Sequence, residues 1–476
     1  MLGQRSVLGS EKMTMDISAT EIREDAERVA SNFRSMLNDL KRRPEDAARE
    51  LGMGLDDVNG ILSGGRPLTE DIVHRALAAW PVSARDFYLL RDDAPQGVKI
   101  MRSAESAASS RVMTRAGRDY YEYRDTVMSA SAAFRPEWIR ELCFVDDNDP
   151  ENELVQWNNG HFLHQFTYFI GPVNFYYRDS LGQKRVAQMN TGDSMYIAPF
   201  VPHTFTTRKN PGNEHGLILA LTYGNNLSGD TQQELSLLDL DQADALALDF
   251  TTSPRASGQL IRFHREGLSM PQSHLAQEIG KAPEDVARIE AGEVSLDGEL
   301  LSAIARALGV GERDLLATGS GEDSVQILAD ADARRWSMNA AVGSSAYDIV
   351  ELCRAPQLPF SKALKIDIRA ARQEYSTTLR TGLHQFIYNI GTIPVATQWK
   401  VHGERQQDVL DPNDSMYLKP GVEHSFAGAG ASLLVLRIGG RVGGDSLHEL
   451  STVGRAYLPR ILGETMQWFN PKGKNG

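Results

Sequence analysis

Hydrophobic and polar residues follow two different periods along this chain. From about residue 19 to residue 90 the apolar positions recur at helical spacing. Within this stretch, residues 43–52 place a proline in the first turn and a glycine just past the end, which is typical of a short helix. A second short helix is expected over 55–62, with glycines after it. Together the two predict a helix-turn-helix.

The helical period is lost between residue 97 and about residue 221. Short apolar and aromatic segments such as 166–170 and 174–177 predict β-strands there. A polar, acidic linker is expected around 225–245. The first half of the chain therefore reads as a helical domain followed by a strand-rich domain.

The second half repeats this plan. The letters of residues 193–196 recur unchanged at 414–417, and residues 276–280 echo 48–52. His384 is followed by glutamine and phenylalanine, as is His164. Matches that keep the same order over two halves indicate a duplicated unit.

The expected fold class is α+β, with a helix-turn-helix-like helical domain and a jelly-roll β-barrel in each unit. The expected parts are a flexible tail (1–18), a first helical domain (19–95), a catalytic barrel (96–225), a linker (226–255), a second helical domain (256–320), a degenerate barrel (321–440) and a C-terminal segment (441–476).

Composition narrows the partners and the location. A net charge of −13 argues against a nucleic acid or an anionic membrane as the main partner. The chain has no run of about 18 apolar residues, and its start lacks the apolar core of a signal peptide. Two cysteines exclude a disulfide framework and fit a reducing compartment. A cytoplasmic protein is expected.

Three side chains of the first barrel have the types and spacing of metal ligands. His161 and Gln165 are four residues apart, which would place them on the same face of one strand. His203 ends a stretch of the form Gly-Asp-x-x-x-x-x-Pro followed by histidine, which is the second half-motif of a cupin barrel. Two imidazoles and one oxygen leave open positions on an octahedral ion. This arrangement suits Fe(II) that binds substrate and O₂ side by side.

The second copy keeps only part of this set. Thr381 stands where the first barrel has His161, whereas Gln385 and His424 are retained. Selective loss of one imidazole favours a metal role over the alternative, a histidine and a glutamine that line a polar barrel interior. Gln165 is unusual because the common third ligand is a carboxylate. Ile197, six residues before His203, supplies none, and no nearby carboxylate is expected to replace the glutamine.

A helix-turn-helix fused to a cupin, with this ligand set, resembles the mononuclear iron phosphonate oxygenases. The motif residues that carry the resemblance are Arg115, Tyr123, Asn158, His161, Gln165 and His203. The tandem arrangement is similar to that of 2-hydroxyethylphosphonate dioxygenases and methylphosphonate synthases. The pairing of a glutamine at 165 with an isoleucine at 197 is similar to that of the synthases.

The resemblance implies a role for each motif residue. His161, Gln165 and His203 would bind Fe(II). Arg115, Tyr123 and Asn158 would hold the phosphonate, and Tyr123 would also be catalytic. Lys41 would be a catalytic lysine supplied in trans, which implies a homo-oligomer. Ser269 occupies the corresponding place in the second copy.

The implied reaction is cleavage of the C–C bond of 2-hydroxyethylphosphonate with O₂, giving methylphosphonate and CO₂. The alternative outcome is hydroxymethylphosphonate and formate. A cupin transcriptional regulator is a different class, but acidic residues such as Asp56 and Asp57 on the second helix disfavour binding to DNA phosphates. A sugar-phosphate isomerase would share the barrel, would not require the helix-turn-helix, and would not consume O₂.

Overall fold

The structure is a computed structural model that describes residues 19–88, 90–132, 134–224, 227, 229–316, 324–339, 345–356, 358–371 and 377–462. The chain divides into two compact units, residues 1–91 with 445–476 and residues 92–444. The tail predicted over 1–18 and the last residues of the C-terminal segment lie outside the described part. Within that part, no helix combines the length and the apolar character that crossing a bilayer requires.

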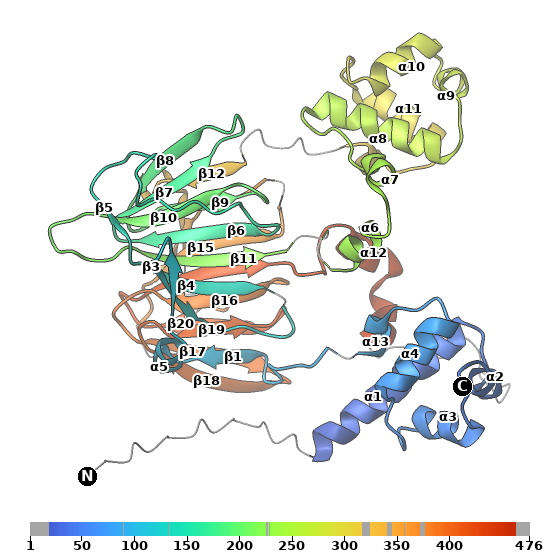
Figure 1. The fold of residues 1–476 in the computed structure, drawn as a ribbon, viewed down its shortest axis with the longest axis horizontal. Helices are drawn as coiled ribbons and strands as arrows, with labels where there is room; N and C mark the ends of the chain where they lie inside the picture. Colours follow the sequence, from blue (N-terminus) through green and yellow to red (C-terminus); the bar gives the residue numbers. More distant parts are fainter. Residues whose placement is uncertain are drawn as a thin grey trace. The chain divides into compact units, whose positions relative to one another are not determined.

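The first unit is helical (Figure 1). Its elements are α1 (Ala19–Asp39), α2 (Pro44–Glu50), α3 (Leu55–Leu62), α4 (Glu70–Ala79), η1 (Ala84–Phe87), α12 (Asp445–Val453), η4 (Arg455–Tyr457) and α13 (Leu458–Leu462). Pro44 occupies the first turn of α2, and Gly52 after it has φ +63°, as the sequence pattern predicts. Buried apolar side chains of α1 to α4, among them Phe33 and Trp80, form the core of this helix-turn-helix.

The second unit contains a further helical segment. Its helices are α5 (Ser103–Ala108), α6 (Asp230–Leu235), α7 (Leu240–Asp244), α8 (Ser253–Gly267), α9 (Gln272–Glu278), α10 (Pro283–Glu290), α11 (Gly298–Leu308), η2 (Glu312–Leu315) and η3 (Asp330–Asp332). Helices α8 to α11 repeat the order and spacing of α1 to α4 and pack around Ile261, Leu275 and Ile304. The stretch predicted as a polar linker carries α6 and α7.

Two β-sandwiches make up the rest of this unit. In the first, β12 (Val325–Leu328), β9 (Ser194–Ile197), β6 (His164–Ile170), β11 (Leu217–Tyr223), β4 (Arg135–Glu141), β3 (Arg118–Asp125) and β2 (Arg111–Arg115) form one sheet in this order. The other sheet has the order β5 (Phe144–Val145), β10 (His203–Arg208), β7 (Val173–Arg178) and β8 (Lys184–Met189). We call this sandwich the first barrel.

The second barrel repeats the arrangement. Its larger sheet has the order β1 (Val98–Met101), β19 (Ser415–Leu418), β16 (His384–Asn389), β21 (Ser432–Ile438), β15 (Ser361–Ile368), β14 (Ser345–Glu351) and β13 (Arg335–Asn339). Its smaller sheet has the order β18 (Glu404–Leu410), β17 (Val395–Val401) and β20 (Glu423–Ala427). The prediction of an α+β chain with duplicated helix-turn-helix and jelly-roll parts is confirmed.

The two barrels exchange their edge strands. Strand β1, which precedes the first barrel in sequence, pairs with β19 of the second barrel, and β12 pairs with β9 of the first (Figure 1). The ranges 96–225 and 321–440 therefore each include a strand that completes the other sheet. A strand added in this way covers main-chain groups that would otherwise remain unpaired at a sheet edge.

The outer faces of the two large sheets share one apolar core. Side chains alternate along a strand, so β6 points Phe166 and Tyr168 outward and Phe169 into its own barrel. On β16, Phe386 and Tyr388 belong to the same outer core as Phe166 and Tyr168. Each barrel thus buries the outer face of the other.

This shared core predicts a large stability cost for truncation at its centre. Phe386 is fully buried, so Phe386→Ala should lower the free energy of unfolding by about 3–5 kcal/mol. Leu181→Ala, at a side chain that is 79% exposed, is the control and should change it by less than about 0.5 kcal/mol. Denaturant unfolding followed by tryptophan fluorescence measures both. Equal effects of the two substitutions would show that the outer faces do not stabilise each other.

Candidate metal centre and substrate pocket

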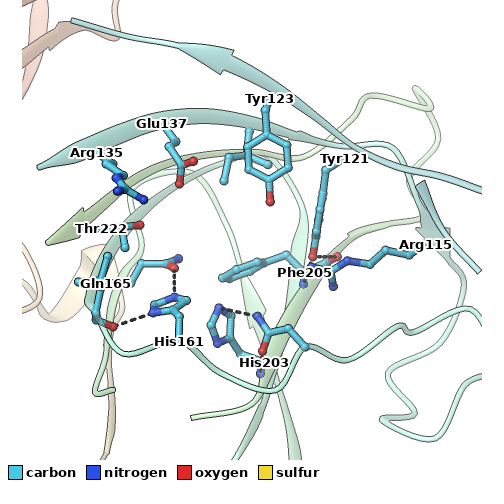
Figure 2. A pocket seen from close by; sticks show the side chains of 13 residues that line it. Arg115, Tyr121, Tyr123, Arg135, Glu137, His161, Gln165, His203, Phe205 and Thr222 are labelled. Carbon is cyan, nitrogen blue, oxygen red and sulfur yellow. Dashed lines mark hydrogen bonds between the residues drawn. The ribbon is translucent and has the colours of Figure 1, made fainter. Parts of the chain in front are cut away.

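A cavity of about 250 Å³ opens inside the first barrel. Its lining comes from strands far apart in the sequence, and the polar side chains point into it (Figure 2). The lining residues are Arg115, Tyr121, Tyr123, Arg135, Glu137, Ile139, Asn158, His161, Leu163, Gln165, His203, Phe205 and Thr222. All six residues that the sequence predicts as ligands of metal or phosphonate in the first barrel are among them.

His161 reaches the cavity from a loop and not from a strand. The prediction that His161 and Gln165 lie on one strand is wrong, because β6 begins only at His164. The loop is held by Gly160, whose φ is +76° and at which a Cβ would lie 2.5 Å from the backbone carbon of Phe200. The Phe200 N–H donates to the carbonyl of His161 over 2.8 Å. This contact brings the imidazole to the side chain of Gln165.

Hydrogen bonds fix the tautomers of both candidate histidines. His161 Nδ1 lies 2.7 Å from the carbonyl oxygen of Leu163, and His203 Nδ1 lies 2.8 Å from that of Val201. A carbonyl oxygen only accepts, so both Nδ1 atoms carry the proton and both Nε2 atoms present a lone pair. Burial lowers the pKa of His203 to about 4, which keeps this imidazole neutral. Neutral imidazoles with fixed tautomers are the form that binds metal.

The amide of Gln165 is also oriented. Its nitrogen donates to the Thr167 hydroxyl over 2.9 Å, which turns the oxygen towards His161 Nε2 at 3.1 Å. Two acceptor atoms that face each other at this distance need a cation or a proton between them. His161 Nε2, Gln165 Oε1 and His203 Nε2 therefore fit a divalent metal ion as a mixed nitrogen and oxygen donor set.

The position of the missing carboxylate lies next to this donor set. Ile197 on β9 is directly opposite Gln165 on β6, and its side chain is fully buried in the barrel core. Side chains of directly opposite residues lie about 5 Å apart at Cβ. A carboxylate at position 197 would therefore start close to where the amide oxygen now sits.

Arg115 lies at the other side of the cavity. One terminal nitrogen, Nη1, donates to the carbonyl of Gln156 over 2.7 Å and to the Thr204 hydroxyl over 3.1 Å. Its guanidinium lies over the rings of Tyr120 and Tyr121, at 5.1 and 4.7 Å from their centroids. Among the described residues, its Nε and Nη2 atoms make no hydrogen bond. Those N–H groups are the ones left for an anionic ligand.

Tyr123 and Asn158 complete this side. The ring of Tyr123 packs edge-on against Tyr121, and its hydroxyl points into the cavity (Figure 2). Burial raises the pKa of Tyr123 well above its ordinary value, so the hydroxyl remains a donor. Asn158 accepts hydrogen bonds from the main-chain N–H groups of Gly160 and His203, at 2.9 and 2.8 Å, and its amide nitrogen lies 3.2 Å from His203 Nε2.

The sequence reasoning missed three polar side chains of the cavity, Arg135, Glu137 and Thr222. Glu137 is the one carboxylate among the lining residues. The expectation that no carboxylate replaces Gln165 as a ligand stays a prediction. Burial raises the pKa of Glu137, and the nearby His161 and Arg135 act in the opposite direction. The signal was present in β4, whose alternate residues 135, 137 and 141 are charged although the strand lies at the centre of a sheet.

Glu141 lies deeper on the same face of β4. Its side chain is fully buried, and neither carboxylate oxygen has a hydrogen-bond partner among the described residues. Burial raises its pKa well above the ordinary value, and the charge of Arg115 opposes this. Burial therefore favours the neutral form of this carboxyl group.

Among the described residues, the corresponding place in the second barrel does not repeat the donor set of the first. Thr381 replaces His161, and its hydroxyl accepts the main-chain N–H of Leu383 at 3.3 Å. The oxygen of Gln385 accepts a hydrogen bond from Arg437 at 2.9 Å, so it is not available to a metal. Of the first donor set, the second barrel keeps only the imidazole of His424 with a free lone pair.

Lys41 lies outside the helices of the first unit. It lies in the turn between α1 and α2 with φ +58°, and Ser269 has φ +52° between α8 and α9. The predicted equivalence of these two positions therefore holds for the backbone. Lys41 Nζ donates to the carbonyls of Asn38 and Asp39 over 3.2 and 3.3 Å. Its predicted role in a neighbouring active site stays a prediction.

Comparisons with known proteins agree with this geometry. The chain is 48% identical to methylphosphonate synthase of Nitrosopumilus maritimus (strain SCM1), over 94% of this chain and 97% of that protein. Residues 261–315 match a helix-turn-helix family.

Solved structures give the same picture. Streptomyces albus HEPD, a 2-hydroxyethylphosphonate dioxygenase solved with its substrate 2-hydroxyethylphosphonate and Fe(II) bound, is 38% identical with a TM-score of 0.87, and the match covers 94% of this chain and 99% of that one. PhpD with cadmium atoms is 19% identical, with a TM-score of 0.70 over 92% of this chain and 99% of that one, and it shows the shared fold alone.

The two barrels are expected to differ in metal binding. We expect one iron per chain, held by His161, Gln165 and His203, because the second barrel has lost one imidazole and uses its glutamine oxygen elsewhere. His161→Ala should abolish binding, and the buried His424→Ala is the matched control that should leave one iron per chain. Metal analysis of anaerobically loaded protein measures this. Two irons per chain, or full occupancy in His161→Ala, would contradict it.

Proposed function

The chain belongs to the methylphosphonate synthase family of iron-dependent phosphonate oxygenases, and on that premise we propose that it cleaves 2-hydroxyethylphosphonate to methylphosphonate and CO₂. The observation that carries this proposal is the donor set itself. Two imidazoles held by hydrogen bonds at Nδ1 and an oriented amide oxygen face one cavity, and Arg115 lies at its other side. A bidentate anion could bind at the donor set and at Arg115 at the same time.

Bound Fe(II) supplies the one-electron chemistry with O₂ that the substrate alone cannot perform. His161, Gln165 and His203 are our candidates to hold this ion. The hydrogen bonds from Nδ1 of each histidine and from the amide nitrogen of Gln165 keep the three donor atoms turned inward. Ligands that are oriented before the metal arrives lose little freedom when it binds.

Arg115 and its neighbours position the substrate. The unused Nε and Nη2 groups of Arg115 would hold two phosphonate oxygens, and Tyr123 and the amide of Asn158 would add neutral donors. Stacking on Tyr120 and Tyr121 keeps the guanidinium plane fixed. The apolar side chains of Ile139 and Phe205 limit the space left for water.

The overall reaction balances without an external reductant. The C–C bond of 2-hydroxyethylphosphonate breaks, the hydroxyl-bearing carbon is oxidised to CO₂, and the phosphonate-bearing carbon gains a hydrogen. O₂ supplies one oxygen atom to CO₂ and the other to water. In the dioxygenase alternative, both oxygen atoms remain in hydroxymethylphosphonate and formate.

Three further features are also part of the proposal. We propose O₂ as co-substrate, a homo-oligomer in which Lys41 of one chain serves the first barrel of another, and a cytoplasmic location. The exposed position of Lys41 in a turn suits a residue that meets a second chain. The two cysteines, Cys143 and Cys353, are not paired with each other, which fits a reducing compartment.

The identity of the third ligand predicts the product. Gln165 leaves the metal one unit more positive than a carboxylate would, provided that no other anion binds. This disfavours hydroxyl transfer to the phosphonate-bearing carbon. The carbon radical would then take hydrogen from the one-carbon fragment. We expect methylphosphonate and CO₂ as the main products, measured by phosphorus NMR after anaerobic iron loading, addition of 2-hydroxyethylphosphonate and exposure to air.

Two variants test the same reasoning. Gln165→Glu and Ile197→Glu each return a carboxylate to the donor set, and each should shift part of the flux to hydroxymethylphosphonate and formate if iron is retained. Gln165→Asn keeps a neutral amide and is the control for disturbance of the site. Carbon-13 at the hydroxyl-bearing carbon appears as CO₂ or as formate in the two outcomes. Stoichiometric labelled formate from the unmodified enzyme would establish the dioxygenase reaction instead.

The trans role of Lys41 predicts complementation between inactive chains. Lys41→Ala should lower turnover about a hundredfold or more and leave iron binding intact, whereas Lys281→Ala, an exposed lysine of the second copy, should not. Mixed oligomers of Lys41→Ala and His161→Ala chains should regain activity, because each chain supplies what the other lacks. Activity of Lys41→Ala alone at the unmodified rate would remove the residue from catalysis. Inactive mixed oligomers would show that Lys41 acts on the barrel of its own chain.

A further inference from the structure

The second barrel carries a half-buried cation, Arg437, at the place that corresponds to the cavity of the first. Strand register defines this correspondence, because Arg437 pairs with Gln385 as Thr222 pairs with Gln165. Arg437 Nε donates to Gln385 Oε1 over 2.9 Å. Ile387, two residues on from Gln385, belongs to the interior core of the second barrel, so Gln385 faces inward as well.

This cation has no anionic partner in the described part of the chain. Among the described residues, the one polar contact of the Arg437 side chain is the hydrogen bond from Nε to Gln385. Burial lowers its pKa, which is the sign of a charge without compensation. The two interior carboxyl groups of the first barrel, Glu137 and Glu141, correspond by register to Leu364 and Ile368.

Two more polar atoms beside Arg437 lack partners among the described residues. They are Gln385 Nε2 and His424 Nε2, and their side chains are 1% and 2% exposed. His424 Nδ1 lies 3.0 Å from the carbonyl oxygen of Val422, so Nδ1 carries the proton and Nε2 is an acceptor. Buried polar atoms without partners destabilise a protein, and a ligand that bonded to them would remove this cost.

We propose that the second barrel binds a small oxyanion that carries one hydroxyl group, such as hydrogen phosphate or a monoprotonated phosphonate, between Arg437, Gln385 and His424. The guanidinium and the amide nitrogen of Gln385 donate to the anionic oxygens. The hydroxyl of the ligand donates to His424 Nε2. An anion without a hydroxyl would leave this imidazole nitrogen unsatisfied.

A metal ion does not fit the same place. The guanidinium would repel it, the glutamine oxygen is already an acceptor, and Thr381 supplies a hydroxyl that is bonded to the main chain. The interior of the first barrel suits a cation, whereas the interior of the second barrel suits an anion. The site is therefore distinct from the metal centre of the first barrel and does not depend on the reaction performed there.

Calorimetric titration of the anaerobic iron-loaded enzyme with inorganic phosphate tests this proposal. The first barrel also offers an arginine, so the titration uses Arg115→Met to remove that site and compares it with Arg115→Met/Arg437→Met. We expect one phosphate per chain in the first and at least tenfold weaker binding in the second. Arg115→Met/Lys400→Met, which removes an exposed lysine of β17, is the matched control and should bind like Arg115→Met. Sulfate, which carries no hydroxyl, should bind more weakly than phosphate.

Thermal unfolding provides a second measurement in case the Arg437→Met substitution destabilises the protein. Phosphate should raise the Tm of Arg115→Met and of Arg115→Met/Arg437→Lys, and not that of Arg115→Met/Arg437→Met, since a ligand stabilises only the protein that binds it. Methylphosphonate in place of phosphate distinguishes a product site from a general phosphate site. Two outcomes would overturn the proposal: the same phosphate affinity with and without Arg437, or no phosphate binding to Arg115→Met. Arg437 would then be an internal cation that stands where the first barrel would hold its metal.

Discussion

The alternation of side chains along β6 and β16 is the constraint on which the rest of the structure depends. Each strand turns one set of residues into its own barrel and the next set towards the other barrel. On β6, Gln165 and Thr167 face the interior of the first barrel, whereas Phe166 and Tyr168 face the shared core. A shift of one residue in register would move the ligand out of the site and an aromatic ring into it. The apolar core between the barrels therefore also sets the position of the donor atoms.

The same constraint explains why a barrel without a metal site is kept. The outward face of the second barrel covers the first, and the exchanged strands β1 and β12 close the edges of both large sheets. Packing between the barrels does not constrain the inward face of the second barrel in this way. That face has exchanged Thr222 for Arg437 and Glu137 for Leu364, while the outward aromatic residues persist. The aromatic residues of β6 and β16 that face the shared core are therefore alike, whereas the polar and charged residues of the two interiors differ.

Charge, more than shape, distinguishes the two interiors. The first barrel presents the lone pairs of its donor set and the carboxyl group of Glu137, and two arginines, Arg115 and Arg135, line the same cavity. The second presents a guanidinium in place of the metal. Since buried charges are costly without partners, each interior defines the sign of what it can bind. The amide of Gln165 is the exception within the first barrel, because it offers oxygen without charge and leaves the anion to be supplied by the substrate.

The sequence by itself determined the duplication, the helix-turn-helix turns, the three donor residues and the loss of one of them at Thr381, because each depends on local pattern or on the comparison of two copies. Only the tertiary structure decided that His161 lies on a loop, that Glu137 enters the cavity and that Arg437 meets Gln385. These facts depend on which strands become neighbours and in which register. Such pairings join residues that are far apart in the chain, as Gln385 with Arg437, 52 positions apart, and no local period records them.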